Sequence, residues 1–419
     1  MGLISRVSKH LVLTLVVLIS IVSHFSCNED YDQFDCDENI APALAPARSP
    51  LAPALSPDIS HDIGDDDPHK ELKEAWNKAC STNNGVLVMP ATESYQLKPI
   101  TFSGPCKSHT TVMITGTIEA SMDMSDYKDR HWLVFKDVNN LKVKGGGTID
   151  GNGKIWWEKS CKKNSSKSCE EENAPTALTF SGCNDLRIDN LRIRNAQQMH
   201  ISFQKCKRVV TSNLIISAPG DSPNTDGIHI TATKNIRILN SVIGTGDDCI
   251  SIVSGSQDIL VSDVTCGPGH GISIGSLGEG ESEAHVSDVL VNRATLFRTT
   301  NGVRIKTWQG GRGRATNIMF ENIDMFDVKN PIIIDQNYCN SKSCPPKESV
   351  VVVSHVYYRN IKGTSQTKSA IIFNCSDNVP CHSILLQDIM LSHDGFKAEA
   401  DCRNVQLVNK GIVSPKCNL

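Results

Sequence analysis

The chain has 419 residues, of which 39% are hydrophobic and 5% aromatic, and its formal net charge is −4. This length can bury one large core or two ordinary ones. The charge excludes a strongly basic nucleic-acid binder, but it does not exclude contact with an acidic polysaccharide, because local charge decides such contacts. Sixteen cysteines indicate an oxidising compartment.

The chain begins with the features of a secretory signal peptide. Basic side chains precede an apolar run over residues 11–22, and small residues at 23–26 offer a cleavage site. The run is short for a transmembrane helix, and no later segment has the roughly 20 apolar residues that span a bilayer. We therefore expect residues 1–26 to be a signal peptide and the mature protein to be secreted without a membrane anchor; an uncleaved signal anchor is the alternative. Glycosylation acceptors at Asn164 and Asn374 fit secretion.

Residues 27–70 are expected to form a linker or exposed arm. The stretch 39–57 repeats Ala-Pro and Ser-Pro, which favours a polyproline-like spacer without a packed core, and an acidic run follows at 62–67. Residues 71–79 have helical character. We expect this helix to cap a catalytic domain that spans residues 71–419.

From about residue 85 onward, short β-branched runs alternate with Gly, Asn and Asp, and no long amphipathic helix interrupts them. One apolar motif recurs at Leu186, Val209, Ile236, Ile259, Val289 and Ile318, and subtracting successive positions gives steps of 23, 27, 23, 30 and 29 residues. A second strand follows each motif, with aligned residues Ile228, Ile250, Ile272, Val303 and Ile332. Such a period predicts an all-β fold, a single-stranded right-handed parallel β-helix filled by stacked aliphatic side chains.

The residue that precedes each second strand is polar. In chain order these residues are Asp226, Asp248, His270, Asn301 and Asn330, with Asp247 beside Asp248. We expect the three carboxylates and the imidazole to lie within roughly 10 Å on one edge of consecutive coils. Strict alternation would turn Asp226 and Asp248 inward, so we infer a bend or bulge at Gly227 and Cys249.

Two cations, Arg304 and Lys306, follow on the next coil and alternate with inward residues, so they should face solvent. Repulsion among stacked carboxylates raises at least one pKa, and glycosidic cleavage needs one protonated acid and one ionised base. The cations could pair with the carboxylate of a uronic acid. Any single aspartate could instead cap a turn, and a lone histidine is more often structural. The joint alignment favours an active site.

Four segments carry a resemblance to a known family. They are Ser-Pro-Asn-Thr-Asp-Gly at 222–227, Gly-Thr-Gly-Asp-Asp-Cys at 244–249, Cys-Gly-Pro-Gly-His-Gly at 266–271 and Arg-Ile-Lys at 304–306. In this order they resemble the signature motifs of the polygalacturonases, glycoside hydrolase family 28, and the flanking sequence is similar to plant members. The resemblance runs from about residue 71 to the C-terminus. It implies hydrolysis of the α-1,4-galacturonan backbone of pectin in the cell wall, without a cofactor.

The resemblance also implies roles for individual residues in an inverting hydrolase. Asp247 would be the general acid, Asp226 and Asp248 would activate water, and His270 would tune or relay protons. Substrate binding would fall to Arg304, Lys306 and Tyr338, with Asn224 orienting the loop that carries Asp226. Carboxylates stacked about 5 Å apart would suggest retention by the usual separation rule, so the rule and the resemblance disagree. No metal is expected, because the chain has no C-x-x-C pair and His270 has no second histidine nearby.

The cysteines suggest a set of disulfides. The resemblance supports Cys249–Cys266, Cys339–Cys344, Cys375–Cys381 and Cys402–Cys417. Further pairs that sequence alone does not decide are Cys80–Cys106, Cys161–Cys169 and Cys183–Cys206. Residues 60–68 depart from the pattern with which plant members open the domain, which puts the first strand and the N-terminal cap in doubt.

Other readings stay open. The first alternative is a related enzyme, either a rhamnogalacturonan hydrolase or a pectate lyase. A lyase would need calcium-binding carboxylates and would leave an unsaturated product. The Arg-Ile-Lys segment instead favours unsubstituted galacturonan as the substrate. A catalytically inactive β-helix that binds carbohydrate is the other, but it would be expected to lack an aspartate. The sequence does not decide between attack within the polymer and attack at its ends; we lean toward attack within it. We expect a monomer whose partner is pectin, with neither nucleic acid nor membrane.

Overall fold

The computed structural model describes residues 68–92, 94–162, 174–339, 347 and 349–418. The predicted signal peptide, most of the predicted arm and the acceptor Asn164 lie outside these ranges, as does most of the departing segment 60–68. None of the helices in the described ranges has the length and apolar character needed to cross a membrane.

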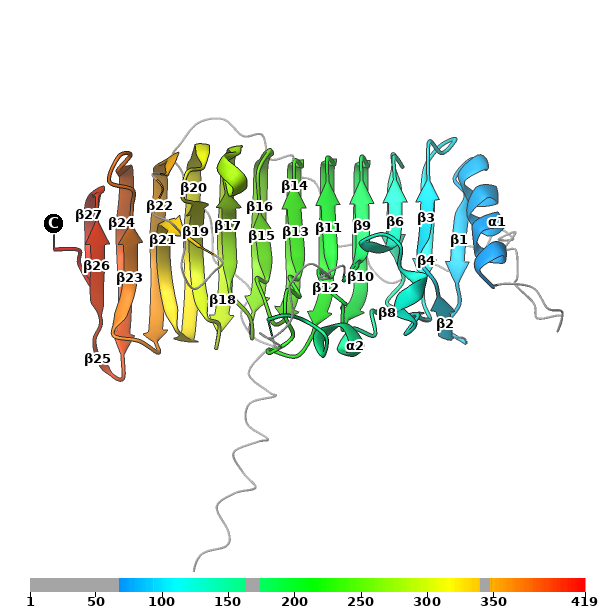
Figure 1. Cartoon of the computed structure of the whole chain (residues 1–419), viewed down its shortest axis with the longest axis horizontal. Coiled ribbons are helices and arrows are strands. Elements are labelled where there is room, and N and C mark those ends of the chain that lie inside the picture. The colour runs from blue at the N-terminus through cyan, green and yellow to red at the C-terminus, as the bar shows by residue number, and fades with distance from the viewer. Residues whose placement is uncertain (1–67, 93, 163–173, 340–346, 348, 419) are drawn as a thin grey trace, which may run out of the picture. The chain divides into compact units, whose positions relative to one another are not determined.

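Helix α1 (Pro68–Ser81) opens the described part of the chain. Because proline suits the first turn of a helix, α1 starts at Pro68, and residues 68–70 belong to the helix rather than to the arm. Its Trp76 ring packs against Phe102, with ring centroids 5.2 Å apart, and its indole N–H donates to the Ser103 carbonyl at 3.1 Å. The helix thus covers the end of the core at the blue end of Figure 1, in the place predicted for a cap.

The strands form two sheets whose members alternate along the chain (Figure 1). In spatial order the first sheet contains β1 (Val86–Met89), β4 (Thr110–Ile114), β7 (Leu141–Lys144), β10 (Asn184–Arg194), β12 (Lys207–Ser217), β14 (Lys234–Gly244), β16 (Ser256–Cys266), β18 (Glu283–Phe297), β20 (Arg312–Val328), β22 (Val350–Ser365), β24 (Cys381–His393) and β25 (Phe396–Lys397), with β2 (Ser94–Leu97), β5 (Thr117–Ala120), β8 (Thr148–Asp150) and β27 (Val405–Ser414) attached beside this path.

The second sheet carries the site described below. In spatial order it contains β3 (Ile100–Ser103), β6 (His131–Lys136), β9 (Thr176–Ser181), β11 (Ile201–Gln204), β13 (Ile228–Thr231), β15 (Ile250–Ile252), β17 (Ile272–Leu277), β19 (Asn301–Trp308), β21 (Asn330–Tyr338), β23 (Ser369–Asn374) and β26 (Glu399–Arg403). Short helices η1 (Met124–Asp126), α2 (Lys154–Trp157) and η3 (Glu279–Glu281) lie in the connections.

Both predicted ladders are present in the strand registers. In the first sheet the paired series is Leu186, Val209, Ile236, Ile259, Val289 and Ile318. In the second it is Ile228, Ile250, Ile272, Val303 and Ile332. These pairs are parallel, and a strand–crossover–strand connection within one sheet is right-handed in nearly all proteins. The predicted right-handed parallel β-helix is therefore confirmed.

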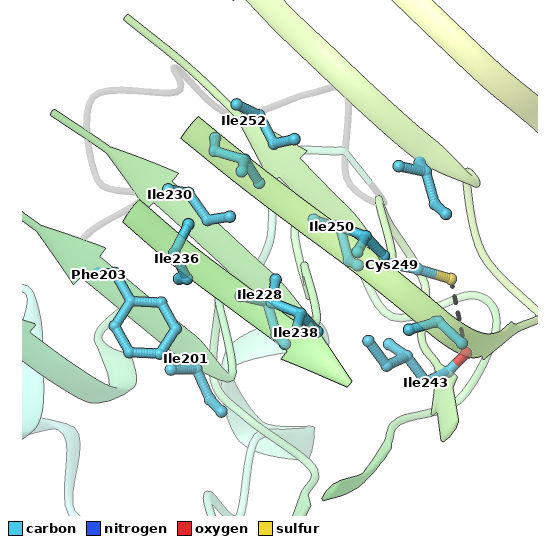
Figure 2. Packing of buried hydrophobic residues seen from close by; sticks show 14 of the residues in the cluster. Ile201, Phe203, Ile228, Ile230, Ile236, Ile238, Ile243, Cys249, Ile250 and Ile252 are labelled. Carbon is cyan, nitrogen blue, oxygen red and sulfur yellow. Dashed lines mark hydrogen bonds between the residues drawn. The ribbon is translucent and has the colours of Figure 1, made fainter. Parts of the chain in front are cut away.

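The core lies between the two sheets. Figure 2 shows Ile228 and Ile250 of the second sheet reaching toward Ile236 and Ile238 of the first. All four side chains are completely buried. Because each coil repeats the same inward positions, isoleucine, leucine and valine fill most of the interior, and the phenylalanine rings of β3, β6, β9 and β11 stack in the same way.

The structure forms several of the expected disulfides: Cys80–Cys106, Cys249–Cys266, Cys375–Cys381 and Cys402–Cys417. Cys344 and Cys169 lie outside the described residues, so the pairs that include them stay predictions. The Cys249–Cys266 bridge ties the turn before β15 to the end of β16, next to the predicted carboxylates.

The expected Cys183–Cys206 disulfide is wrong: the two cysteines are buried free thiols at equivalent positions of neighbouring coils. Each sulfur hydrogen-bonds a carbonyl two residues back, Cys183 to Ser181 and Cys206 to Gln204. In the next coil the hydroxyl of Thr233 makes the same bond. Each sulfur lies closer still to a carbonyl of the preceding coil, Cys183 to Phe135 at 3.4 Å and Cys206 to Phe180 at 3.3 Å.

Candidate active site

The side chains predicted as catalytic lie in the turns that precede three consecutive strands of the second sheet. Asp226 precedes β13, the pair Asp247 and Asp248 precedes β15, and His270 precedes β17. The turns stack, because the Gly227 N–H donates to the Asp248 carbonyl at 2.9 Å. The predicted column of polar positions is therefore present in the structure.

The predicted break in alternation is found at Gly227. Ile228 points into the core, yet Asp226, two residues earlier, faces the other side of the sheet, where its Oδ2 accepts from the Ser251 hydroxyl at 2.7 Å. A Cβ at position 227 would lie 2.4 Å from the Ile243 side chain and 2.6 Å from the Cys249 carbonyl. Only glycine fits this bend, and the bend turns the carboxylate outward.

Asp248 is the most fully paired carboxylate of the site. Its Oδ1 accepts from Arg304 Nη2 at 2.8 Å and from the Ser273 hydroxyl at 2.8 Å, and its Oδ2 accepts from Lys306 Nζ at 3.0 Å. The Asp248 side chain is only 3% exposed. Both cations lie on the outward face of the sheet, but they do not face solvent as predicted: their side chains are 14% and 10% exposed, because they neutralise this buried charge in the free protein.

Asp247 is bound to His270. Its Oδ1 lies 2.9 Å from His270 Nδ1, and its Oδ2 lies 3.5 Å from Lys162 Nζ. Burial raises the pKa of Asp247, but the hydrogen bond and charge of His270, together with Lys162 and Lys306, outweigh burial and hold this pKa well below its ordinary value. The free site therefore keeps Asp247 ionised.

Asp226 has the opposite shift. Burial raises its pKa; the His229 imidazole, 3.8 Å away, acts against this, and the nearby charges of Asp247 and Asp248 add to it. We predicted a raised pKa from carboxylate repulsion, but burial is the larger cause. The raised pKa also belongs to Asp226 and not to Asp247, the residue expected to act as the acid. The reason is that the cationic partners gather around Asp247 and Asp248.

The three aspartates line a cleft of about 810 Å³ together with Lys162 and Lys306. Near Lys306, the Tyr338 ring centroid is 5.3 Å from the ammonium and packs edge-on against Trp308. The cleft is lined by Arg130, Lys162, Gln198, Met199, Asn224, Asp226, His229, Asp247, Asp248, Ser251, Val253, Ser254, Gly275, Ser276, Gly278, Glu279, Ser282, Lys306 and Tyr338. Asn224 and Tyr338 are thus found in the same hollow as the carboxylates.

Two members of the predicted column do not join the carboxylates. The Asn301 amide donates to the His270 carbonyl at 3.3 Å, and the Asn330 amide donates to the Thr300 carbonyl at 3.0 Å. Both side chains support the backbone of neighbouring turns, the structural role that asparagine often has at bends.

Sequence reasoning missed several polar groups of the site: Lys162, His229, Ser251 and Ser273. The serines are the middle residues of Ile-Ser-Ile triplets, so the same alternation that placed Arg304 outward could have found them. Lys162 is 85 residues away from Asp247 in sequence, and no pattern pointed to it.

Ligand atoms of Asp247, Asp248 and His270 lie within 4.8 Å of one another, close enough to hold a metal ion. However, both oxygens of Asp248 already accept from Arg304 or Lys306. A divalent cation would have to displace these positive groups or approach them closely, so the donor set does not favour a metal.

The sequence profile of glycosyl hydrolases family 28 matches residues 80–415. The chain belongs to this family. A polygalacturonase of Arabidopsis thaliana is 55% identical over 360 residues, which cover 84% of this chain and 81% of the relative. Polygalacturonase-2 of Solanum lycopersicum is 55% identical over 350 residues, covering 83% and 76%. Among solved structures, a polygalacturonase from Erwinia carotovora has a TM-score of 0.68 at 22% identity, covering 83% of this family 28 chain and 95% of its own, and shares the fold.

Proposed function

We propose that this family 28 chain is a polygalacturonase that hydrolyses the α-1,4-linked galacturonic acid bonds of pectin. The observation that carries the proposal is the grouping of Asp226, Asp247 and Asp248 in one cleft with Lys306, and with Arg304 paired to Asp248. Carboxyl groups supply the acid and base of glycoside hydrolysis, and the cations match the carboxylates of the substrate. The relatives that are 55% identical carry the name polygalacturonase.

In the proposed reaction, Asp247 donates a proton to the leaving glycosidic oxygen. Its lowered pKa in the free site would oppose this role. A bound galacturonate brings its own negative carboxylate into the cleft, and a negative neighbour raises the pKa of a carboxyl group. His270, bonded to Asp247 at 2.9 Å, is the adjacent group that can return a proton between turnovers.

Asp226 and Asp248 act on the attacking water in this proposal. Asp248 is held in place by three hydrogen bonds, so its orientation is set before substrate arrives. Arg304 and Lys306 would shift part of their bonding to the galacturonate carboxylate, with the Tyr338 ring beside the sugar. Asn224, which has a left-handed backbone (φ 56°) two residues before Asp226, would orient the loop.

We propose attack within the polymer and inversion at the anomeric carbon. Attack within the polymer is supported by a second hollow of about 590 Å³ on the outward face of the same sheet. Its residues Thr101, Val134 and Thr179 form one register row that continues through Ser202 to His229 in the cleft. A long substrate could therefore span both hollows along one face of the sheet. Inversion is typical of the family.

A pectate lyase is the second candidate, but the pairing of Asp248 with two cations does not suit the calcium site that such an enzyme needs. The cysteine bridges fit an extracellular protein, and we propose the cell wall as its place of action.

The test is incubation of the purified secreted protein with de-esterified polygalacturonate. We expect saturated products, new reducing ends, intermediate-sized fragments at early times, and the inverted anomer by proton NMR. Asp247→Asn should lose at least about a hundredfold in rate, as for a general acid. Asp263→Asn is the matched control, because Asp263 pairs with Arg293 on the first sheet, away from the cleft. Unsaturated products would instead identify a lyase, and release of monomer alone would identify attack at chain ends.

A further inference from the structure

A hydrogen-bonded chain of three side chains runs along the floor of the cleft. His229 on β13 and Ser251 on β15 are paired in register, and His229 Nδ1 lies 2.7 Å from the Ser251 oxygen. The Ser251 hydroxyl donates to Asp226 Oδ2 at 2.7 Å. Ser251 is 2% exposed and its two contacts are short, so the hydroxyl is held between the imidazole and the carboxylate.

When Asp226 is ionised, the hydrogen count fixes the direction of the chain. A serine hydroxyl has one proton, and Ser251 gives it to Asp226, so its oxygen must accept from His229 Nδ1–H. This arrangement holds for a neutral imidazole with its proton on Nδ1 and for an imidazolium. In both states His229 donates to Ser251, and Ser251 donates to Asp226.

Asp226 differs from Asp247 and Asp248 in the groups that balance its negative charge. Asp248 pairs with Arg304 and Lys306, whereas within the described residues the ion pair of Asp226 is with His229, at 3.8 Å.

The strands on both sides of β13 present only uncharged residues in register with His229, namely Ser202 and Ser251. The charged groups that act on Asp226 besides His229 are the carboxylates Asp247 and Asp248, which disfavour its ionisation.

We propose that His229 and Ser251 are positioning residues that favour the ionised form of Asp226 against its burial and aim it at the attacking water. This inference rests on the proposed function, in which Asp226 acts as a base. Ser251 is the immediate donor, and His229 acts through it, both by ordering the hydroxyl and by its positive charge when protonated. The same arrangement recurs at Asp248 one coil further along, where the Ser273 hydroxyl donates to the carboxylate and accepts from Arg304.

The experiment compares pH profiles of kcat/KM on polygalacturonate for the wild type, Ser251→Ala, His229→Leu and the double variant. Each single change should move the acid limb upward by about half to one pH unit, which lowers kcat/KM roughly three- to tenfold below the limb. The change should appear mainly in kcat, with KM within about twofold. Because the two residues form one chain, the double variant should shift no more than the larger single variant.

Two further variants separate this role from a general loss of structure. Ser251→Thr restores the hydroxyl and should return the acid limb toward the wild-type position. Ser212→Ala is the matched control, because the Ser212 hydroxyl also donates to a carboxylate of the neighbouring coil, Asp189, at 2.7 Å, but on the first sheet, away from the cleft. Its acid limb should not move.

A carbon-13 NMR titration of the Asp226 carboxyl tests the same chain without any turnover, with Asp226→Asn identifying the signal. The midpoint should rise in Ser251→Ala and in His229→Leu. If the wild type is inactive on polygalacturonate, the proposed function fails while this titration still tests the chain. If the wild type is active but neither variant moves the acid limb or the Asp226 midpoint, or if the two shifts simply add, the inference is overturned.

Discussion

At the scale of single residues, the site separates three chemically identical carboxyl groups by their surroundings. Asp248 is bonded to two cations, Asp247 to an imidazole, and Asp226 to a serine in a buried turn. The opposite pKa shifts of Asp226 and Asp247 follow from these differences. In the free site these shifts favour protonation of Asp226 and ionisation of Asp247, so the proposed roles require bound substrate to raise the pKa of Asp247.

Asp226 should limit stability as well as support activity. A carboxyl whose pKa is raised in the folded protein stabilises the fold while it is protonated, and this contribution is lost as the pH rises through that pKa. Asp226→Asn stays neutral at every pH. We therefore expect its melting temperature at pH 7 to exceed that of the wild type by roughly a few degrees, with the difference shrinking toward low pH.

Asp248→Asn provides the contrast, measured in the same calorimetric series. It leaves Arg304 and Lys306 in a nearly dry site without their counter-charge, so it should lower the melting temperature at pH 7. Stabilisation by both variants, or by neither, would contradict the assignment of the buried charge penalty to Asp226.

At the scale of elements, each strand of the second sheet has an inward face that builds the core and an outward face that builds the cleft. In β15, Ile250 and Ile252 point inward while Ser251 points outward. The turn that carries Asp247 and Asp248 therefore leads directly into β15, the strand that contributes Ile250 to the core ladder. Core packing at Ile250 holds Asp247 and Asp248 in place.

Ile250→Ala should test this coupling. The side chain is completely buried between Ile228 and Ile272, so its removal should cost about 2–5 kcal/mol in the free energy of unfolding, measured by denaturant titration. Val242→Ala on β14 is the control, because Val242 is 48% exposed and its truncation should change stability by less than about 0.5 kcal/mol. Equal effects of the two variants would contradict the ladder as the source of stability.

The sequence predicted the elements well where they repeat. Spacing identified both ladders, and alternation placed Arg304 and Lys306 on the outward face. It did not reveal that these cations bind Asp248, because the reach between a turn and a strand 56 residues later depends on how the coils stack. It also missed Lys162, which comes from a connection rather than from a strand and carries no periodic signal.

At the scale of the whole described domain, the cleft and the second hollow lie along one face of one sheet. This layout predicts that longer galacturonate oligomers bind more tightly. With the Asp247→Asn variant, a hexamer should raise the melting temperature more than a trimer at equal concentration, because binding to the native state stabilises it by mass action. Equal shifts for both oligomers would mean that the hollow over β3, β6 and β9 takes no part in binding.

The pairing of Asp248 with Arg304 and Lys306 has a consequence for biosynthesis. The two cations follow Asp248 by 56 and 58 residues, so they leave the ribosome several seconds later at about 5–20 residues per second. During that interval a nascent chain that contains the coil of Asp248 has not yet received the two cations that pair with this carboxylate. The cleft becomes electrostatically complete only when the coil of β19 has been added. The order of the coils along the chain therefore makes completion of the site a late step of synthesis.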